Sequence, residues 1–219
     1  MPIPKIIHQT YVSYAQLPLI TRFFMKRMLG LCPGYRHEFY DDERIDQFLI
    51  EEYGAKVHST YRKIAIGAAK ADFFRYALLL KKGGIYLDVD SSVLRNLDGL
   101  TKPDDVAVIA NENNPGVYVQ WALIYAPGHP FLAATLDKVM GNIETNRFPN
   151  DVHRMTGPSA YSEAIDECIA SKGTGVKYRK VGIDYEGYFR FKTPWAGLLY
   201  RRRPNWRTVQ QERGVLFPG

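Results

Sequence analysis

The sequence predicts an α/β fold in a single domain that spans residues 1–219. Helical and strand-like segments alternate along the chain, and the clearest pair is a helix expected at residues 65–80 followed directly by a strand at residues 85–89. The 219 residues are 46% hydrophobic and 24% charged, which are ordinary values for a globular domain that buries a full core. No internal repeat or low-complexity linker divides the chain.

Residues 65–90 are the most informative part of the chain. The helix is built from apolar residues and good helix formers. Two lysines at residues 81–82 suit the negative end of the helix dipole, and two glycines at residues 83–84 favour a left-handed C-terminal cap. The residues that follow have the period of two that is typical of a β-strand. This period places Ile85, Leu87 and Val89 on one face and Tyr86, Asp88 and Asp90 on the other.

Asp88 and Asp90 are the candidate metal ligands. On one face of a strand they would lie roughly 7 Å apart, and two carboxylates this close repel each other unless a cation lies between or in front of them. Oxygen ligands at the end of a buried strand suit Mn²⁺ or Mg²⁺, which keep open positions for water or phosphate oxygens. The alternative is ordinary turn chemistry, in which one aspartate caps the turn and the other is solvated.

Asp72 and Arg75 are the charged pair of the preceding helix. This helix is apolar nearly all round and should therefore be buried, so a charge within it needs a reason. At about 100° per residue, Asp72 and Arg75 lie on one side of the helix together with Ala68, a small residue that leaves room for an approaching group. The alternatives are a surface ion pair or a buried pair kept for packing specificity.

Residues 71–76, Leu79 and residues 83–90 together resemble the signature of glycosyltransferase family 32, the D-x-D sugar transferases that include fungal initiating mannosyltransferases and bacterial capsule enzymes. The same run is more distantly similar to the glucosylating clostridial toxins. The resemblance implies a GT-A fold with a mixed, mostly parallel central sheet flanked by helices. It also implies a nucleotide-sugar donor (a UDP- or GDP-sugar), a Mn²⁺ or Mg²⁺ ion, and transfer with retention of anomeric configuration.

Further donor contacts are expected at the ends of two early strands. Residues 3–10 read as a short buried strand that ends in His8, Gln9 and Thr10, and polar residues at the carboxyl end of a strand are where α/β sheets bind ligands. This strand resembles the first strand of the family, which lies beside the nucleotide. Tyr40 occupies the place of a family aromatic residue and would either stack on the base or pack in the core.

The resemblance assigns roles residue by residue. It implies catalytic roles for Asp72, Arg75, Asp88 and Asp90, with Asp88 and Asp90 as metal ligands, and donor contacts from His8, Gln9, Thr10, Tyr40, Asp72, Arg75, Tyr86 and Asp88. The chain departs from the family at two places: residues 120–121 are Gln-Trp where an Asn is common, and residues 192–195 contain no His. Asp151 and His153 are further candidates for the site.

The formal charge of +6 indicates attraction to anionic partners without choosing among them. The basic cluster at residues 201–203 would be a solvated tail, a peripheral membrane contact, or a source of an arginine that reaches a diphosphate; nucleic acid is not the expected partner. No apolar run reaches 18 residues and the N-terminus has no signal-peptide pattern, so we expect a soluble cytoplasmic protein. Cys32 and Cys168 have no metal-site spacing.

The predicted function is a metal-dependent, retaining glycosyltransferase. It would move a hexose from a nucleotide-diphosphate sugar to a hydroxyl of a sugar or glycan, as in polysaccharide biosynthesis. One alternative is a phosphatase of the haloacid-dehalogenase type, which also places Asp-x-Asp after an apolar strand and uses the first aspartate as nucleophile. A non-catalytic module that binds glycans or polyanions is the second alternative.

Overall fold

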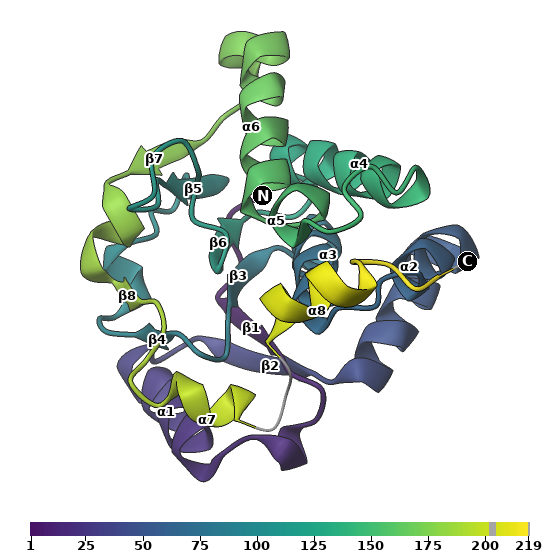
Figure 1. The fold of residues 1–219 in the computed structure, drawn as a ribbon. Helices are drawn as coiled ribbons and strands as arrows, with labels where there is room; N and C mark the ends of the chain where they lie inside the picture. Colours follow the sequence, from purple (N-terminus) through teal and green to yellow (C-terminus); the bar gives the residue numbers. More distant parts are fainter. Residues whose placement is uncertain (202–204, 219) are drawn as a thin grey trace.

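The computed structural model describes residues 1–201 and 205–218. Within them, a central sheet of six strands has the order β2-β1-β3-β6-β5-β7 (Figure 1). The pairs β1/β2, β1/β3 and β5/β7 are parallel, and β3/β6 and β5/β6 are antiparallel. The strands are β1 (Ile6–Thr10), β2 (Arg36–Tyr40), β3 (Gly84–Leu87), β5 (Ala107–Ala110), β6 (Ala122–Tyr125) and β7 (Arg179–Val181). This mixed, mostly parallel sheet confirms the predicted α/β class.

Helices cover both faces of this sheet. Tyr86 of β3 points into a core with the central helix α3, whereas Ile85 and Leu87 point into a second core that contains Met28 of α1. The alternation predicted for these three residues is thereby confirmed. The helices on the α3 side are α2 (Asp42–Arg62), α3 (Gly67–Lys82), α4 (Pro130–Glu144), α5 (Val152–Met155) and α6 (Pro158–Lys172), and α1 (Leu19–Leu31) lies on the other side.

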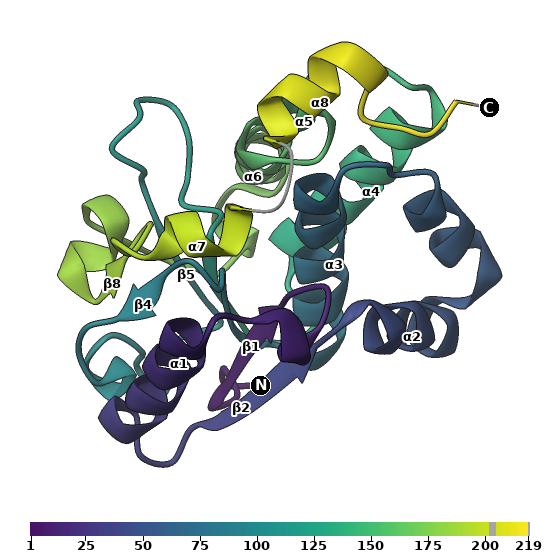
Figure 2. The same ribbon diagram turned by 60° about the horizontal axis from the view of Figure 1, so that its bottom comes forward.

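The C-terminal part of the chain returns to the segment that follows β3. A two-stranded antiparallel sheet joins β4 (Ser92–Val93) to β8 (Phe189–Arg190). Figure 1 shows α7 (Ala196–Tyr200) beside α1, and Figure 2 shows α8 (Trp206–Arg213) beside α5. In the described part of the chain, no helix combines the length and the apolar character that crossing a bilayer requires.

The junction between α3 and β3 needs its two glycines. Gly83 and Gly84 have φ values of 62° and 101°, which lie in the left-handed region, and the backbone N–H of Gly83 caps the carbonyl of Leu79. A Cβ at Gly83 would also lie 2.6 Å from Cδ of Pro127. The predicted glycine cap is confirmed.

The predicted strand at residues 85–89 is too long at its C-terminal end. β3 ends at Leu87, and the backbone N–H of Ser91 donates to the carbonyl of Asp88 at 2.9 Å, which closes a turn. Asp90 therefore takes its position from this turn, and the strand alternation does not place it.

Candidate active site

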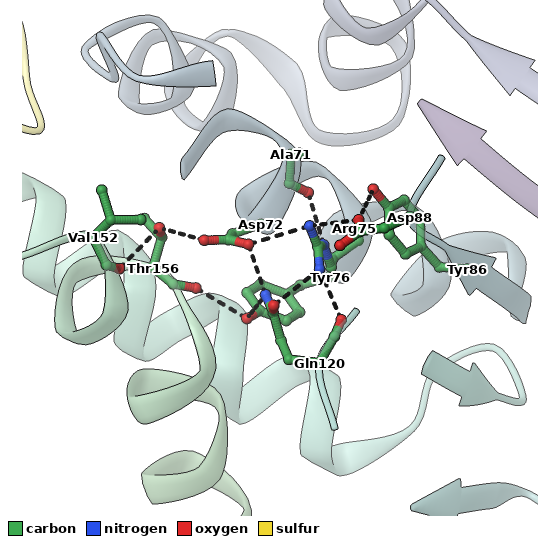
Figure 3. A network of polar contacts seen from close by, with 9 residues as sticks. All are labelled: Ala71, Asp72, Arg75, Tyr76, Tyr86, Asp88, Gln120, Val152 and Thr156. Carbon is green, nitrogen blue, oxygen red and sulfur yellow. Dashed lines mark hydrogen bonds and ion pairs between the residues drawn. The ribbon is translucent and has the colours of Figure 1, made fainter. Parts of the chain in front are cut away.

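Arg75 lies between two acidic side chains. Its Nη2 atom is 3.3 Å from Oδ1 of Asp72, one turn earlier in α3, and 3.0 Å from Oδ1 of Asp88, directly after β3 (Figure 3). Asp72 and Arg75 are buried, and the Asp88 side chain is 25% exposed. The structure thus brings together three of the four residues predicted to be catalytic.

The remaining N–H groups of Arg75 are also occupied. Nε donates to the carbonyl of Ala71 at 3.2 Å, and Nη1 donates to the backbone carbonyl and to Oε1 of Gln120 at 2.8 and 2.9 Å. The guanidinium also lies over the ring of Tyr86, 4.6 Å from its centroid. Burial lowers the pKa of Arg75, but the carboxylates of Asp88 and Asp72 outweigh this effect and raise it. Arg75 therefore positions carboxylates and has no donor left for a phosphate.

Asp72 is held by a network that local sequence patterns do not reveal. Oδ1 accepts from Nε2 of Gln120 at 2.8 Å, and Oδ2 accepts from the Thr156 hydroxyl at 2.9 Å. Nε2 of Gln120 also donates to the Tyr76 hydroxyl, which in turn donates to the carbonyl of Thr156 (Figure 3). Sequence reasoning missed Gln120 and Tyr76 as members of the site. The available signal was an amide next to an apolar strand, because a buried amide requires partners.

Asp88 and Asp90 differ in how their oxygens are used. Oδ1 of Asp88 accepts from Arg75 and from the hydroxyl of Tyr86, the latter at 3.0 Å. Oδ2 of Asp90 accepts from the hydroxyl of Tyr200 at 2.9 Å, whereas Oδ1 of Asp90 is buried and has no hydrogen-bond partner in the described chain. Burial raises the pKa of both carboxyl groups, because the charged form loses hydration.

This donor set fits a hard divalent cation. A buried carboxylate oxygen without a partner costs free energy, and an ion such as Mn²⁺ or Mg²⁺ commonly takes one or two carboxylates and completes its shell with water and phosphate oxygens. Among the described residues, no group of three or more His, Cys, Asp or Glu side chains could hold a metal. Asp151 caps α5 and His153 stacks on Trp206, so these two candidates do not complete the site.

The C-terminal segment at residues 193–200 lies against the Asp88–Asp90 turn. The backbone N–H of Thr193 donates to the carbonyl of Asp90 at 2.8 Å, and Tyr200 reaches the Asp90 side chain. Trp195 stacks on Phe24 of α1, with the ring centroids 3.7 Å apart. The hydroxyl of Tyr200 is a contact of the site that sequence reasoning did not find.

The predicted donor contacts on β1 and β2 separate onto two faces of the sheet. Gln9 lines a small pocket with Val89 and Ser91 of the Asp88–Asp90 turn region, and the Thr10 hydroxyl donates to the carbonyl of Tyr40 at 2.8 Å. His8 and Tyr40 instead line a groove of about 410 Å³ next to α2. The structure therefore places Gln9, and not His8 or Tyr40, beside the Asp88–Asp90 turn.

His8 and Tyr40 have structural contacts of their own. Nε2 of His8 lies 3.0 Å from the carbonyl of Gly83, and burial lowers the pKa of His8 to about 4. The Tyr40 ring packs against Phe74, and its hydroxyl donates to Glu38 at 2.7 Å. For Tyr40 the structure shows core packing, the second of the two alternatives left open by the sequence.

Parts of this chain are similar in sequence to known proteins. Residues 21–108 match the family model described as the glycosyltransferase sugar-binding region containing DXD motif. The chain is 41% identical over 96 residues to the uncharacterized glycosyltransferase L373 of Acanthamoeba polyphaga mimivirus, covering 43% of this chain and 38% of that protein. It is 28% identical over 193 residues to the initiation-specific alpha-1,6-mannosyltransferase of Schizosaccharomyces pombe, covering 74% of this chain and 48% of that protein. The chain thus spans less than half the length of either relative.

A solved structure has the same fold. The PaToxG glycosyltransferase superposes with a TM-score of 0.65 at 19% sequence identity, over 80% of this chain and 73% of that chain. This likeness confirms the predicted GT-A arrangement of sheet and helices. The region matched by the family model contains Asp72, Arg75, Asp88 and Asp90. Residues 21–108 of this chain are thus similar to the sugar-binding region of the DXD-containing glycosyltransferases.

Proposed function

We propose that this chain is a metal-dependent glycosyltransferase that moves a hexose from a nucleoside diphosphate sugar to a hydroxyl of a sugar or glycan, with retention of anomeric configuration. The observation that supports this function best is the unpartnered Oδ1 of Asp90, which lies in the same turn as Asp88 and is buried. A phosphate-bound divalent cation is a ligand of the charge and size that this pair of carboxylates accepts. The mannosyltransferase relative supports a hexose as the transferred group.

The proposed mechanism follows from the charges that develop as the bond between the sugar and the diphosphate breaks. Departure of the nucleoside diphosphate leaves a sugar with oxocarbenium character and adds negative charge to the phosphates. A Mn²⁺ or Mg²⁺ ion held by Asp88 and Asp90 would supply Lewis-acid stabilisation of this leaving group. Arg75 fixes Asp88 in place and Tyr86 donates to the same oxygen, so the carboxylate is oriented before the donor binds.

Asp72 is suited to binding a sugar hydroxyl. Its Oδ2 atom accepts one hydrogen bond from the described chain, that from Thr156, and a carboxylate oxygen can accept two. The proposed path is a displacement on the face of the sugar that the leaving group occupies, in which a phosphate oxygen of the leaving diphosphate accepts the proton of the attacking hydroxyl. Asp72 then orients the sugar and forms no covalent bond to it.

The phosphatase alternative fits this site less well. That chemistry requires the first aspartate to attack a phosphorus atom as a free nucleophile. Here Oδ1 of Asp88 is bound to Arg75 and Tyr86, and the matched family transfers sugars. The binding-module alternative does not account for the buried cluster of Asp72, Arg75 and Asp88.

A panel of UDP- and GDP-hexoses incubated with the protein and Mn²⁺ tests the proposal through release of nucleoside diphosphate. We expect release with at least one donor, its abolition by EDTA, and a loss of at least a hundredfold in Asp90→Asn, which keeps the side-chain shape. The matched control is Asp137→Asn on the exposed side of α4, which should behave as the parent protein. Unchanged release in Asp90→Asn, or phosphate release from phosphomonoesters, would overturn the proposal.

A further inference from the structure

Helix α1 and the segment at residues 193–200 form one continuous surface, which we call the α1/α7 face. Phe24 stacks on Trp195, and Leu17, Met25 and Leu199 form a small core between the two helices. The hydroxyl of Tyr11 donates to the carbonyl of Leu199 at 2.8 Å. Figure 1 shows the two helices side by side.

Three large apolar side chains of the α1/α7 face are exposed. Leu19 and Phe23, one turn apart on α1, are 80% and 59% exposed, and Leu198 on α7 is 49% exposed. Isolated exposed apolar residues are normal on a protein surface. Three of them on adjoining helices, joined by a stacked Phe-Trp pair, indicate a surface that meets an apolar partner.

The two sequence stretches that build the α1/α7 face carry cations and no acids. The chain has 23 Asp and Glu residues, yet none lies within residues 1–37 or 187–211, the two stretches that build the α1/α7 face. The cations on α1 are Arg22, Lys26 and Arg27, and those around α7 in the described chain include Arg190, Lys192 and Arg201. Arg202 and Arg203, named above as part of a basic cluster, lie outside the described residues.

We infer that the α1/α7 face docks on an anionic lipid bilayer. Leu and Phe side chains among Lys and Arg, without acidic residues, are the composition of surfaces that lie in the headgroup region of membranes. The apolar side chains enter the acyl boundary, and each cation near the surface adds electrostatic attraction to anionic lipids. A nucleic acid would match the cations but would leave Leu19 and Leu198 without an apolar partner.

The α1/α7 face is directly connected to the candidate active site. Tyr200 of α7 donates to Oδ2 of Asp90, and the backbone of Thr193 donates to the carbonyl of Asp90. A bilayer on this face therefore lies next to the metal site. On the basis of the proposed function, the acceptor hydroxyl then belongs to a lipid headgroup or to a lipid-linked sugar.

Cosedimentation of the full chain with vesicles tests the docking without any donor. We expect binding to vesicles of equal parts phosphatidylcholine and phosphatidylserine, little binding to phosphatidylcholine alone, and weaker binding at high salt. Lys26→Glu/Arg27→Glu should reduce the partition coefficient by roughly tenfold or more, and Leu19→Ser/Phe23→Ser should reduce it by a similar factor at every salt concentration.

The controls are matched variants on other surfaces. Lys56→Glu/Lys63→Glu reverses two exposed charges at α2, and Ile50→Ser removes an exposed apolar side chain there; both should bind vesicles as the parent protein does. No binding to the anionic vesicles, or equal losses in the control variants, would overturn the inference. So would binding of duplex DNA in place of vesicles, or a dimer in solution that Leu19→Ser/Phe23→Ser converts to a monomer.

The two proposals can fail separately. Leu19→Ser/Phe23→Ser should still release nucleoside diphosphate from a soluble donor, whereas transfer to an acceptor embedded in vesicles should fall at least tenfold. Vesicle binding without donor hydrolysis would overturn the proposed function alone. Donor hydrolysis without vesicle binding would overturn the docking alone.

Discussion

The hydroxyl of Tyr200 donates to Oδ2 of Asp90 across 110 residues of sequence, at a distance of 2.9 Å. The other oxygen of this buried carboxylate has no hydrogen-bond partner within the described chain. Tyr200 thus fixes the orientation of Asp90 and leaves Oδ1 for an incoming ligand. The last turn of α7 is in this way part of the candidate metal site.

Tyr200→Phe removes this bond while keeping the ring. A hydrogen bond to a charged group contributes about 1.5–3 kcal/mol, so a less firmly oriented Asp90 should require roughly tenfold more Mn²⁺ for half-maximal donor hydrolysis. The Mn²⁺ dependence of nucleoside diphosphate release measures the effect. Tyr178→Phe, on the surface near α4, is the control and should leave this dependence unchanged. A tighter or unaltered requirement for Mn²⁺ in Tyr200→Phe would show that the hydroxyl does not support the metal site.

Arg75→Lys should destabilise the fold. A lysine cannot reproduce the planar fork that contacts Ala71, Gln120, Asp72 and Asp88, and it leaves buried acceptors without donors. Breaking a buried ion pair costs about 3–5 kcal/mol, and urea unfolding measures the loss. Arg36→Lys, in an exposed pair with Glu38, should change the free energy of unfolding by less than about 0.5 kcal/mol.

The local features of this fold could be predicted from sequence because they depend on neighbouring residues. The glycine cap follows from the preference of Gly83 and Gly84 for positive φ, and the burial of α3 follows from its apolar composition. The pairing of Asp72 with Arg75 follows from their spacing of three on one helix. Each of these features is determined by residues that lie close together in the sequence.

The long-range partners could not be predicted in this way. Gln120 reaches Asp72 across 48 residues, and Tyr200 reaches Asp90 across 110, so no periodicity links them. The position of Asp90 was derived from a strand that in fact ends at Leu87, because hydrogen bonding in the turn stops the alternation. The polar residues at the end of β1 do not form one group of contacts, because neighbouring side chains of a strand point to opposite faces.

Gln120→Asn tests whether the buried hydrogen-bond network around Asp72 requires the length of the glutamine side chain. The family commonly carries Asn in this region, but here the longer side chain reaches Asp72, Tyr76 and Arg75 together. An Asn amide is one methylene shorter and cannot contact all three, so we expect a loss of about 1–3 kcal/mol in the free energy of unfolding. Gln47→Asn, in an exposed pair with Glu51, should have little effect in the same urea titration. Equal stability of Gln120→Asn and the parent protein would mean that loss of one of these hydrogen bonds does not destabilise the fold.

His8 should make the stability of the protein depend on pH below neutrality. Burial lowers its pKa from 6.5 to about 4, so between these values the unfolded chain binds a proton at His8 that the folded chain does not. The contribution of a neutral His8 is complete above pH 6.5 and is lost as the pH falls to about 4, and the shift corresponds to about 3 kcal/mol.

The measurement for His8 is the difference in the free energy of unfolding between the parent protein and His8→Gln from pH 7 to pH 4, which cancels the other titrating groups. Glutamine keeps an N–H donor for the carbonyl of Gly83 but does not titrate, so the parent protein should lose stability relative to His8→Gln as the pH falls. His58→Gln is the control, because His58 is partly exposed and paired with Asp46. A difference that stays constant with pH would mean that His8 titrates alike in the folded and unfolded chains, and that burial does not govern its protonation.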